Sequence, residues 1–338
     1  MKMTTEPFIS VITPVYNGEP FLSECIESVL RQTYGNYEYI IVNNCSRDRT
    51  LEIATAYANK DNRIRVYSNE QFVGVIENHN GAFRRIAPES KYCKVVSGDD
   101  WIFPECIARL VDIAESNPSV GLVGSYQLSG AGKARKAWRV KWTELPYPST
   151  VIPGRELCRA YLLEGPPYAF GTPTSLLYRS SLVRAQNEFY PNLTAEADTS
   201  ACFKYLMNSD FGFVHQVLSY ERVHEETMSA QSRRFHAYMP STLSDLLEYG
   251  PCCLSDVELA RRVKVVLHDY YDYLGRAVFH RKNRNREFWN YHKRRLADLG
   301  YPLSGLKLSK AICSSLLDSV LNPKKTAEII VGKLGRGA

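Results

Sequence analysis

The chain has 338 residues, of which 44% are hydrophobic and 23% charged, and its formal net charge is +6. These proportions exclude a disordered or collagen-like chain, because they provide enough apolar surface to bury a sizeable core. The charge is uneven: residues 251–338 carry 17 Lys and Arg against 8 Asp and Glu, a net +9, which leaves −3 for residues 1–250.

Strands and helices alternate through the first 128 residues. Short apolar runs rich in β-formers predict strands at 8–14, 37–42, 64–67, 92–96 and 120–128, and helical periodicity predicts helices at 20–32, 51–57, 75–87 and 104–116. This alternation is typical of an α/β fold, in which crossover units build a mostly parallel sheet flanked by helices. Ligands bind such sheets beyond the carboxyl ends of the strands. We therefore expect the polar clusters after these strands to converge on one crevice.

The second half of the chain is less regular. Residues 130–175 predict little secondary structure, whereas a helix at 195–208 and a strand at 211–218 follow them. After about residue 240 the pattern is helical, and Ser255 with Glu258 forms a capping box. We expect an α/β domain at 1–239, with halves of about 1–128 and 129–239, and a basic α-helical C-terminal region at 240–338.

The expected location is cytoplasmic, at most peripheral on the inner face of the cell membrane. No apolar run is long enough to span a bilayer, no leader pattern opens the chain, and the nine scattered cysteines are typical of a reducing compartment. The C-terminal basic residues form either a solvated helix face, a surface for anionic lipid, or a contact in a homo-oligomer. Nucleic acid is not an expected partner. The basic residues are Arg261, Arg262, Arg281, Lys282, Arg284, Arg286, Lys293, Arg294 and Arg295.

Two adjacent acids end the fourth predicted strand. Asp99 and Asp100 follow Gly98, and Pro104 stands shortly after them. Neighbouring carboxylates at the mouth of a parallel sheet favour a hard divalent cation, Mg²⁺ or Mn²⁺, which takes oxygen ligands. The alternative interpretation is that Asp100 caps the helix that follows.

Four segments in this order carry a family pattern. They are Thr13-Pro14-Val15-Tyr16-Asn17, the stretch from Val42-Asn43-Asn44 to Thr50, the stretch from Asn69 to Ala82, and Ser97-Gly98-Asp99-Asp100. Together they resemble the family-2 glycosyltransferases of GT-A fold, whose segments usually read T-P-x-Y-N, V-D-[DN]-x-S-x-D-x-T, N-x-x-x-x-G…N-x-N-x-A and a D-x-D type motif. The resemblance covers about residues 7–128.

This resemblance implies a donor site for a nucleoside-diphosphate sugar, with a UDP- or dTDP-sugar expected. Asn43 stands where the family's usual Asp hydrogen-bonds the base, and because an amide donates as well as accepts, the identity of the base stays open. Asp99 would face ribose and metal, and Asp100 the metal. The residues expected to contact the donor are Thr13, Pro14, Tyr16, Glu19, Asn43, Asn44, Ser46, Asn78 and Asp99.

Sugar transfer also needs a base, because the attacking hydroxyl must lose a proton. The family usually shows a Glu-Asp pair at the start of a helix; Asp198 matches the Asp, while Ala197 replaces the Glu. We expect Asp198 to be the base, with Glu196 as the second candidate; a first-turn acid that interacts with the helix dipole is the alternative. His224 resembles the family's strand-end His and is expected beside the metal, against the alternative of a surface His.

A base opposite a leaving diphosphate implies in-line displacement with inversion. The expected function is therefore metal-dependent transfer of a sugar to a hydroxyl of a glycan or lipid-linked acceptor, in surface polysaccharide synthesis. Departures from the family pattern at Asn43, Arg49 and Ala197 favour the alternative, a non-catalytic nucleotide-sugar-binding or scaffold protein of the same fold. Gln231-Ser232-Arg233-Arg234-Phe235 is close to the Q-x-x-R-W motif of processive synthases, and we interpret it as chance or as a basic loop.

Overall fold

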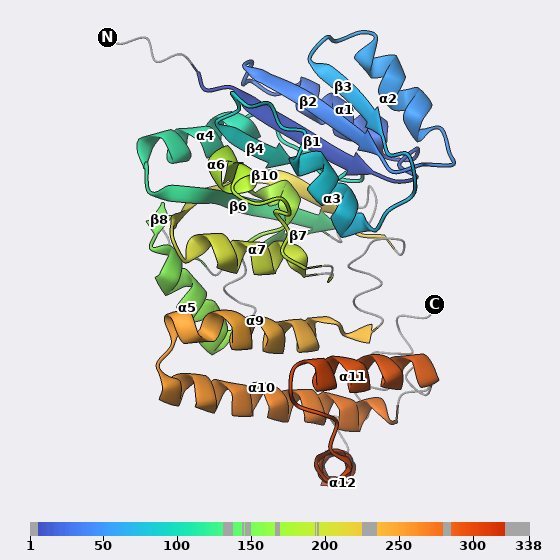
Figure 1. Cartoon of the computed structure of the whole chain (residues 1–338), viewed down its shortest axis with the longest axis vertical. Helices are drawn as coiled ribbons and strands as arrows, with labels where there is room; N and C mark the ends of the chain where they lie inside the picture. The colour runs from blue at the N-terminus through green and yellow to red at the C-terminus, as the bar shows by residue number, and fades with distance from the viewer. Residues whose placement is uncertain are drawn as a thin grey trace. The chain divides into compact units, whose positions relative to one another are not determined.

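The computed structural model describes residues 6–130, 138–143, 145, 150–165, 170–192, 194, 196–224, 235–279 and 285–321. Contacts within the chain divide it into two units, Met1–Gln231 and Ser232–Ala338 (Figure 1). The segment 231–234 of the synthase-like motif lies outside the described residues, as do Arg281, Lys282 and Arg284 of the basic region.

One mixed sheet forms the centre of the first unit, in the order β3-β2-β1-β4-β9-β6-β10-β5. Neighbours in β3-β2-β1-β4 run parallel, as do β6 and β10, whereas β9 is antiparallel to both β4 and β6. The α/β class with a mostly parallel sheet, expected from the sequence, is confirmed. The strands are β1 Ile9–Val15, β2 Tyr37–Asn43, β3 Ile64–Ser68, β4 Tyr92–Val95, β5 Trp101–Ile102, β6 Val120–Gly130, β7 Arg139–Lys141, β8 Val151–Ile152, β9 Leu177–Arg179 and β10 Asp210–Arg222.

Helices flank this sheet, and β1 and β2 are buried along their whole length because such strands are covered on both faces. In the first helix Cys25, Ile26 and Val29 recur at helical spacing, and all three join the core that contains β1 and β2. The helices are α1 Leu22–Leu30, α2 Thr50–Ala58, α3 Val75–Phe83, α4 Cys106–Ser116, α5 Gly154–Glu164, α6 Ser180–Arg184 and α7 Ala197–Leu206, with a 3₁₀ turn, η3, at Pro173–Ser175.

Helix α5 corrects the expectation of little regular structure at 130–175. Its buried residues Leu157, Cys158 and Leu162 have helical spacing, but over only 11 residues between Pro153 and Gly165. The first residue of this helix, Gly154, has room only for a glycine, because a Cβ there would collide with the backbone carbonyls of residues 206 and 209. Close packing against the end of α7 therefore defines α5, and a local pattern does not reveal such a contact.

The parallel strands bring their following loops to one edge of the sheet. The backbone N–H of Asn44 donates to the carbonyl of Val15 at 2.9 Å, and that of Val96 donates to Ile12 at 3.0 Å. A Cβ at Gly98 would lie 2.8 Å from a Val15 methyl group, so glycine lets the turn after β4 approach the end of β1. The loops after β1, β2 and β4 thus meet at one edge.

The second unit is helical in its described part, with α9 Tyr238–Cys253, α10 Asp256–Ala277, α11 Arg286–Asp298 and α12 Gly305–Leu321. Ser255 caps α10 in the predicted box with Glu258. Tyr270 and His292 join α10 to α11 through a 2.7 Å hydrogen bond, and burial lowers the pKa of His292 to about 4. No helix in the described ranges is long and apolar enough to cross a membrane.

Candidate active site

The loops after β1 and β2 are bonded to each other in both directions. The N–H of Asn17 donates to the Ser46 hydroxyl at 2.9 Å, and the N–H of Glu19 donates to the Asp48 carboxylate at 2.9 Å. Asn17 adopts a left-handed backbone conformation, with φ 49°. Two return bonds run from the N–H groups of residues 47 and 49 to the side chains of Asn17 and Glu19, at 2.9 and 3.1 Å. Glu19 and Ser46, expected to contact the donor, therefore brace this edge of the sheet.

A chain of asparagine side chains fixes the next loop. The buried Asn44 oxygen accepts from the N–H of Val73 and from the Asn69 amide, both at 3.0 Å. The same Asn69 amide group donates to Asn78 at 2.9 Å. Asn43 accepts from the N–H of residue 46 at 3.1 Å and donates to the residue 68 hydroxyl at 3.2 Å. These amides hold the loops after β2 and β3 in place.

Thr13 does not reach the rim of this edge. Its hydroxyl is fully buried, donates to the Val96 carbonyl at 2.8 Å and contacts the Tyr39 hydroxyl at 2.9 Å. Pro14, the next residue, is buried as well. The structure therefore does not place the Thr13 side chain, expected to contact the donor, at the rim, because β1 directs it into the core.

Tyr16 does present surface to the rim, since 41% of it is exposed. Its ring packs edge-on against Phe72, which is 60% exposed, with 4.9 Å between the ring centroids. Sequence reasoning missed Phe72, which lies in the glycine-containing segment quoted for the family pattern. Two exposed aromatic rings at the mouth of the sheet offer a stacking surface for a planar base.

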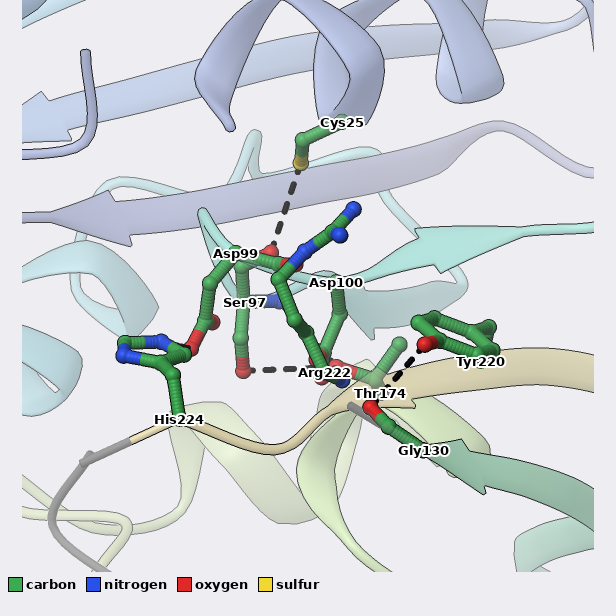
Figure 2. A network of polar contacts seen from close by, with 9 residues as sticks. All are labelled: Cys25, Ser97, Asp99, Asp100, Gly130, Thr174, Tyr220, Arg222 and His224. Atoms are coloured by element: carbon green, nitrogen blue, oxygen red, sulfur yellow. Dashed lines mark hydrogen bonds and ion pairs between the residues drawn. The ribbon is translucent and has the colours of Figure 1, made fainter. Parts of the chain in front are cut away.

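Asp99 and Asp100 face different partners (Figure 2). The partly exposed Asp99 carboxylate lies 3.0 Å from Nε2 of His224. The Asp100 carboxylate is buried: one oxygen accepts from the Thr174 hydroxyl at 2.6 Å, and the other accepts from the N–H of Arg222 at 2.9 Å. Burial, followed by the charge of Asp99, raises the pKa of Asp100 well above its usual range.

Arg222 fastens the end of β10 to this turn and to α1. Its Nε donates to the carbonyl of Asp99 at 3.0 Å, and its guanidinium pairs with Glu24 and lies 4.5 Å from the Phe21 ring centroid. Phe21 also packs against His224 at 5.3 Å. Sequence reasoning missed Arg222 although it stands two residues before His224, and it missed Thr174, which carries no local signal.

Two of the three residues expected to bind the metal lie close together. About 3.0 Å separates neighbouring ligands on an octahedral cation with bonds of about 2.1 Å, and the Asp99 oxygen and the His224 nitrogen lie at this separation. Asp100 has other partners: its carboxylate is buried, and each of its oxygens accepts one hydrogen bond from the protein. In the part of the chain that the structure describes, no three His, Cys, Asp or Glu side chains converge on a common point. Asp100 thus has different hydrogen-bond partners from Asp99 and His224, and its expected role as a metal ligand stays a prediction.

Asp198 lies in the first turn of α7, and its carboxylate accepts from the N–H of Thr199 at 2.9 Å. Burial, followed by the charge of Glu196, raises the pKa of Asp198 to about 7. A carboxyl group with this pKa is suited to accept a proton near neutral pH. Glu196 itself stands at the N-cap of α7.

The charges of Asp99 and Asp198 each affect one of two neighbouring rings. The ring of His79, on α3, packs against Tyr190 with 5.6 Å between centroids. The charge of Asp99 favours protonation of His79, although burial lowers the pKa of this His overall. Burial raises the pKa of Tyr190 well above its usual range, and the charge of Asp198 adds to this effect. The two acids thus lie within electrostatic range of two rings that contact each other.

Known proteins share this sequence pattern and this fold. The model of the family described as glycosyl transferase family 2 matches residues 10–184. EpsJ of Bacillus subtilis (strain 168), an uncharacterised glycosyltransferase, is 41% identical over 111 residues, which are 33% of this chain and 31% of EpsJ. The chain spans about a third of the length of the first curated relatives it matches.

Two solved structures resemble the fold at low identity. TarS of S. aureus (residues 1–349, in complex with UDP-GlcNAc) aligns with a TM-score of 0.62 and 19% identity over 86% of this chain and 80% of that one. The mannosyltransferase PcManGT of Pyrobaculum calidifontis, in complex with GDP-Man and Mn²⁺, aligns with a TM-score of 0.53 and 14% identity over 96% and 83%. Because the family model matches more than half of the residues, the chain belongs to glycosyl transferase family 2.

Proposed function

We propose that this protein is an inverting, metal-dependent glycosyltransferase that moves a sugar from a nucleoside diphosphate to a hydroxyl group. The observation that carries the proposal is the partly exposed Asp99 carboxylate, which lies 3.0 Å from His224 at the carboxyl edge of the sheet. Family membership and the Mn²⁺ complex of PcManGT support it.

Each residue of the site has a defined task in this proposal. Asp99 and His224 would hold Mn²⁺ or Mg²⁺, and the cation, when bound, stabilises the negative charge that builds on the leaving diphosphate. Asp198 accepts the proton of the attacking hydroxyl, for which its pKa of about 7 suits it. Attack by that hydroxyl in a single displacement inverts the anomeric carbon.

The exposed rings of Tyr16 and Phe72 would stack on the base of the donor, beside the amide of Asn43. A UDP- or dTDP-sugar is the proposed donor, and the UDP-GlcNAc complex of TarS supports the uridine case. A glycan or lipid-linked sugar is the proposed acceptor, in surface polysaccharide synthesis.

A thermal-shift panel of UDP-, dTDP-, GDP- and CMP-sugars with Mn²⁺ tests this donor class. We expect a UDP- or dTDP-sugar to raise the unfolding temperature, because a ligand at about 100 times its Kd adds about 2.7 kcal/mol to the free energy of unfolding. The free nucleoside diphosphate should then accumulate on incubation with glycan acceptors. Donor binding without turnover across acceptors would contradict the enzymatic proposal and favour the scaffold alternative.

For the C-terminal unit we propose docking on an anionic membrane surface. Leu306, Leu317 and Leu321 of α12 are 70%, 61% and 74% exposed, and their spacings of 11 and 4 residues place them on one helix face. Lys307 and Lys310 lie on the same helix. Apolar side chains among cations are typical of a helix that lies in a bilayer interface.

Sedimentation with phosphatidylglycerol vesicles tests this docking. We expect the protein to pellet with them, and the double variant L306S/L317S to remain in the supernatant, because each lost Leu removes apolar area from the interface. The matched control is Val257→Ser, which changes an exposed apolar residue of α10. Equal pelleting of both variants would contradict the proposal, and a dimer in light scattering that L306S/L317S abolishes would identify a homo-oligomer contact instead.

A further inference from the structure

The contacts of Asp100 differ from those of its neighbour Asp99. Its carboxylate is 5% exposed and accepts one hydrogen bond from each side, from the Thr174 hydroxyl at 2.6 Å and from the N–H of Arg222 at 2.9 Å. One partner belongs to η3 and the other to the end of β10 (Figure 2). Asp100 therefore links three segments that are far apart in the sequence.

Thr174, the partner in η3, is itself held by buried hydrogen bonds. Lys94, fully buried in β4, donates to the carbonyl of Thr174 and, at 3.0 Å, to that of Leu176. The Thr174 hydroxyl also accepts from the N–H of Ser97 at 3.1 Å. The buried Lys94 ammonium group bonds two carbonyls of this turn and so holds the Thr174 side chain in place. Any movement of the turn would leave buried polar groups without hydrogen bonds.

The β10 partner continues directly into the metal side of the site. Arg222 holds the carbonyl of Asp99 at 3.0 Å, and two residues later His224 meets the Asp99 carboxylate at 3.0 Å. A shift of the backbone at residue 222 would therefore move His224 relative to Asp99. The N–H of Arg222 is bonded to Asp100.

We propose that Asp100 is a positioning residue and not a metal ligand: it joins η3 to the end of β10 and so holds His224 against Asp99. This inference rests on the proposed function, because it concerns the cation site of that reaction. It assigns Asp99 and His224 to the cation, and Asp100, Thr174 and Lys94 to the frame behind them.

The replacement of a carboxylate by an amide separates the two roles. In Asp100→Asn the amide oxygen still accepts from the N–H of Arg222, and the amide nitrogen donates to the Thr174 hydroxyl, whose proton turns to Ser97, 3.3 Å away. If Asp100 only positions its neighbours, both of its hydrogen bonds persist in this variant. If Asp100 binds the metal, the variant loses the negative charge that binds the cation. Asp100→Leu removes both contacts, and Thr174→Val removes one of them.

The experiment is a calorimetric titration of the full-length protein with Mn²⁺ in the presence of UDP, alongside circular dichroism. We expect Asp100→Asn to keep the Mn²⁺ Kd within about threefold of the wild type, and Asp99→Asn to lose binding. Asp100→Leu and Thr174→Val should weaken Mn²⁺ about 10- to 100-fold, the usual cost of removing a residue that orients a ligand. Thr174→Ser, which keeps the hydroxyl, should restore wild-type affinity.

Three outcomes would overturn this inference. Loss of Mn²⁺ binding in Asp100→Asn equal to that in Asp99→Asn would make Asp100 a ligand and leave the proposed function intact. Unchanged binding in folded Thr174→Val would remove the link through η3. A wild-type protein that binds no Mn²⁺ with UDP would instead contradict the metal-dependent function itself, and the inference with it.

Discussion

Replacement of Asp198 by Asn is expected to lower kcat about 10²- to 10⁴-fold, the usual contribution of a positioned general base. An amide cannot take the proton of the attacking hydroxyl, whereas the donor site of the variant is unchanged, so KM for the donor should stay within about threefold. The measurement is initial-rate kinetics with the donor that the thermal-shift panel identifies.

The pH dependence of kcat tests the same assignment independently. The pKa of Asp198 is raised to about 7, and the base must be deprotonated to act, so kcat should rise with pH and level off above about 7. The charge of Glu196 contributes to this raised pKa. Glu196→Gln should therefore shift the midpoint to lower pH and leave the plateau in place. A plateau that falls further in Glu196→Gln than in Asp198→Asn would identify Glu196 as the base.

Replacement of Asp99 by Asn is expected to reduce transfer about 10²- to 10³-fold, as when one electrostatic contact to a developing anion is removed. The side chain is partly exposed and the change is isosteric, so the fold should be retained. Rates measured against Mn²⁺ concentration should show that the remaining activity needs far more metal.

Asp112→Asn is the matched control for this prediction, because Asp112 is an exposed aspartate on α4. It should transfer at the wild-type rate with the wild-type Mn²⁺ dependence. If Asp99→Asn retained wild-type transfer and metal dependence, Asp99 would not hold the cation.

The sequence predicted the half of the fold that is built from local patterns. β1 to β4 and α1 to α4 are apolar runs and amphipathic stretches separated by polar turns, and both signals are readable within a dozen residues. β9 was missed because it is a three-residue strand, Leu177–Arg179, inserted antiparallel between β4 and β6. Only its distant neighbours make it a strand.

The candidate site, too, was predicted in part from local patterns and in part missed. Its expected place at the carboxyl edge of the sheet followed from the alternation of strands and helices, but the tasks of single side chains did not. Thr13 and Asn44 stand in motif positions, yet their polar atoms bond to residues as far as 83 positions away along the chain. A side chain that faces a ligand and one that braces a loop have the same letters in the sequence. The difference lies in hydrogen-bond partners that only the folded chain brings near.

The reciprocal bonds between the loops after β1 and β2 have a consequence for engineering. Each loop supplies both backbone donors and side-chain acceptors to the other, through Asn17, Glu19, Ser46 and Asp48. A chimera that imports one loop from a relative with another donor would leave half of these bonds without partners. We therefore expect these four bonds to survive a transplant only when both loops are moved together.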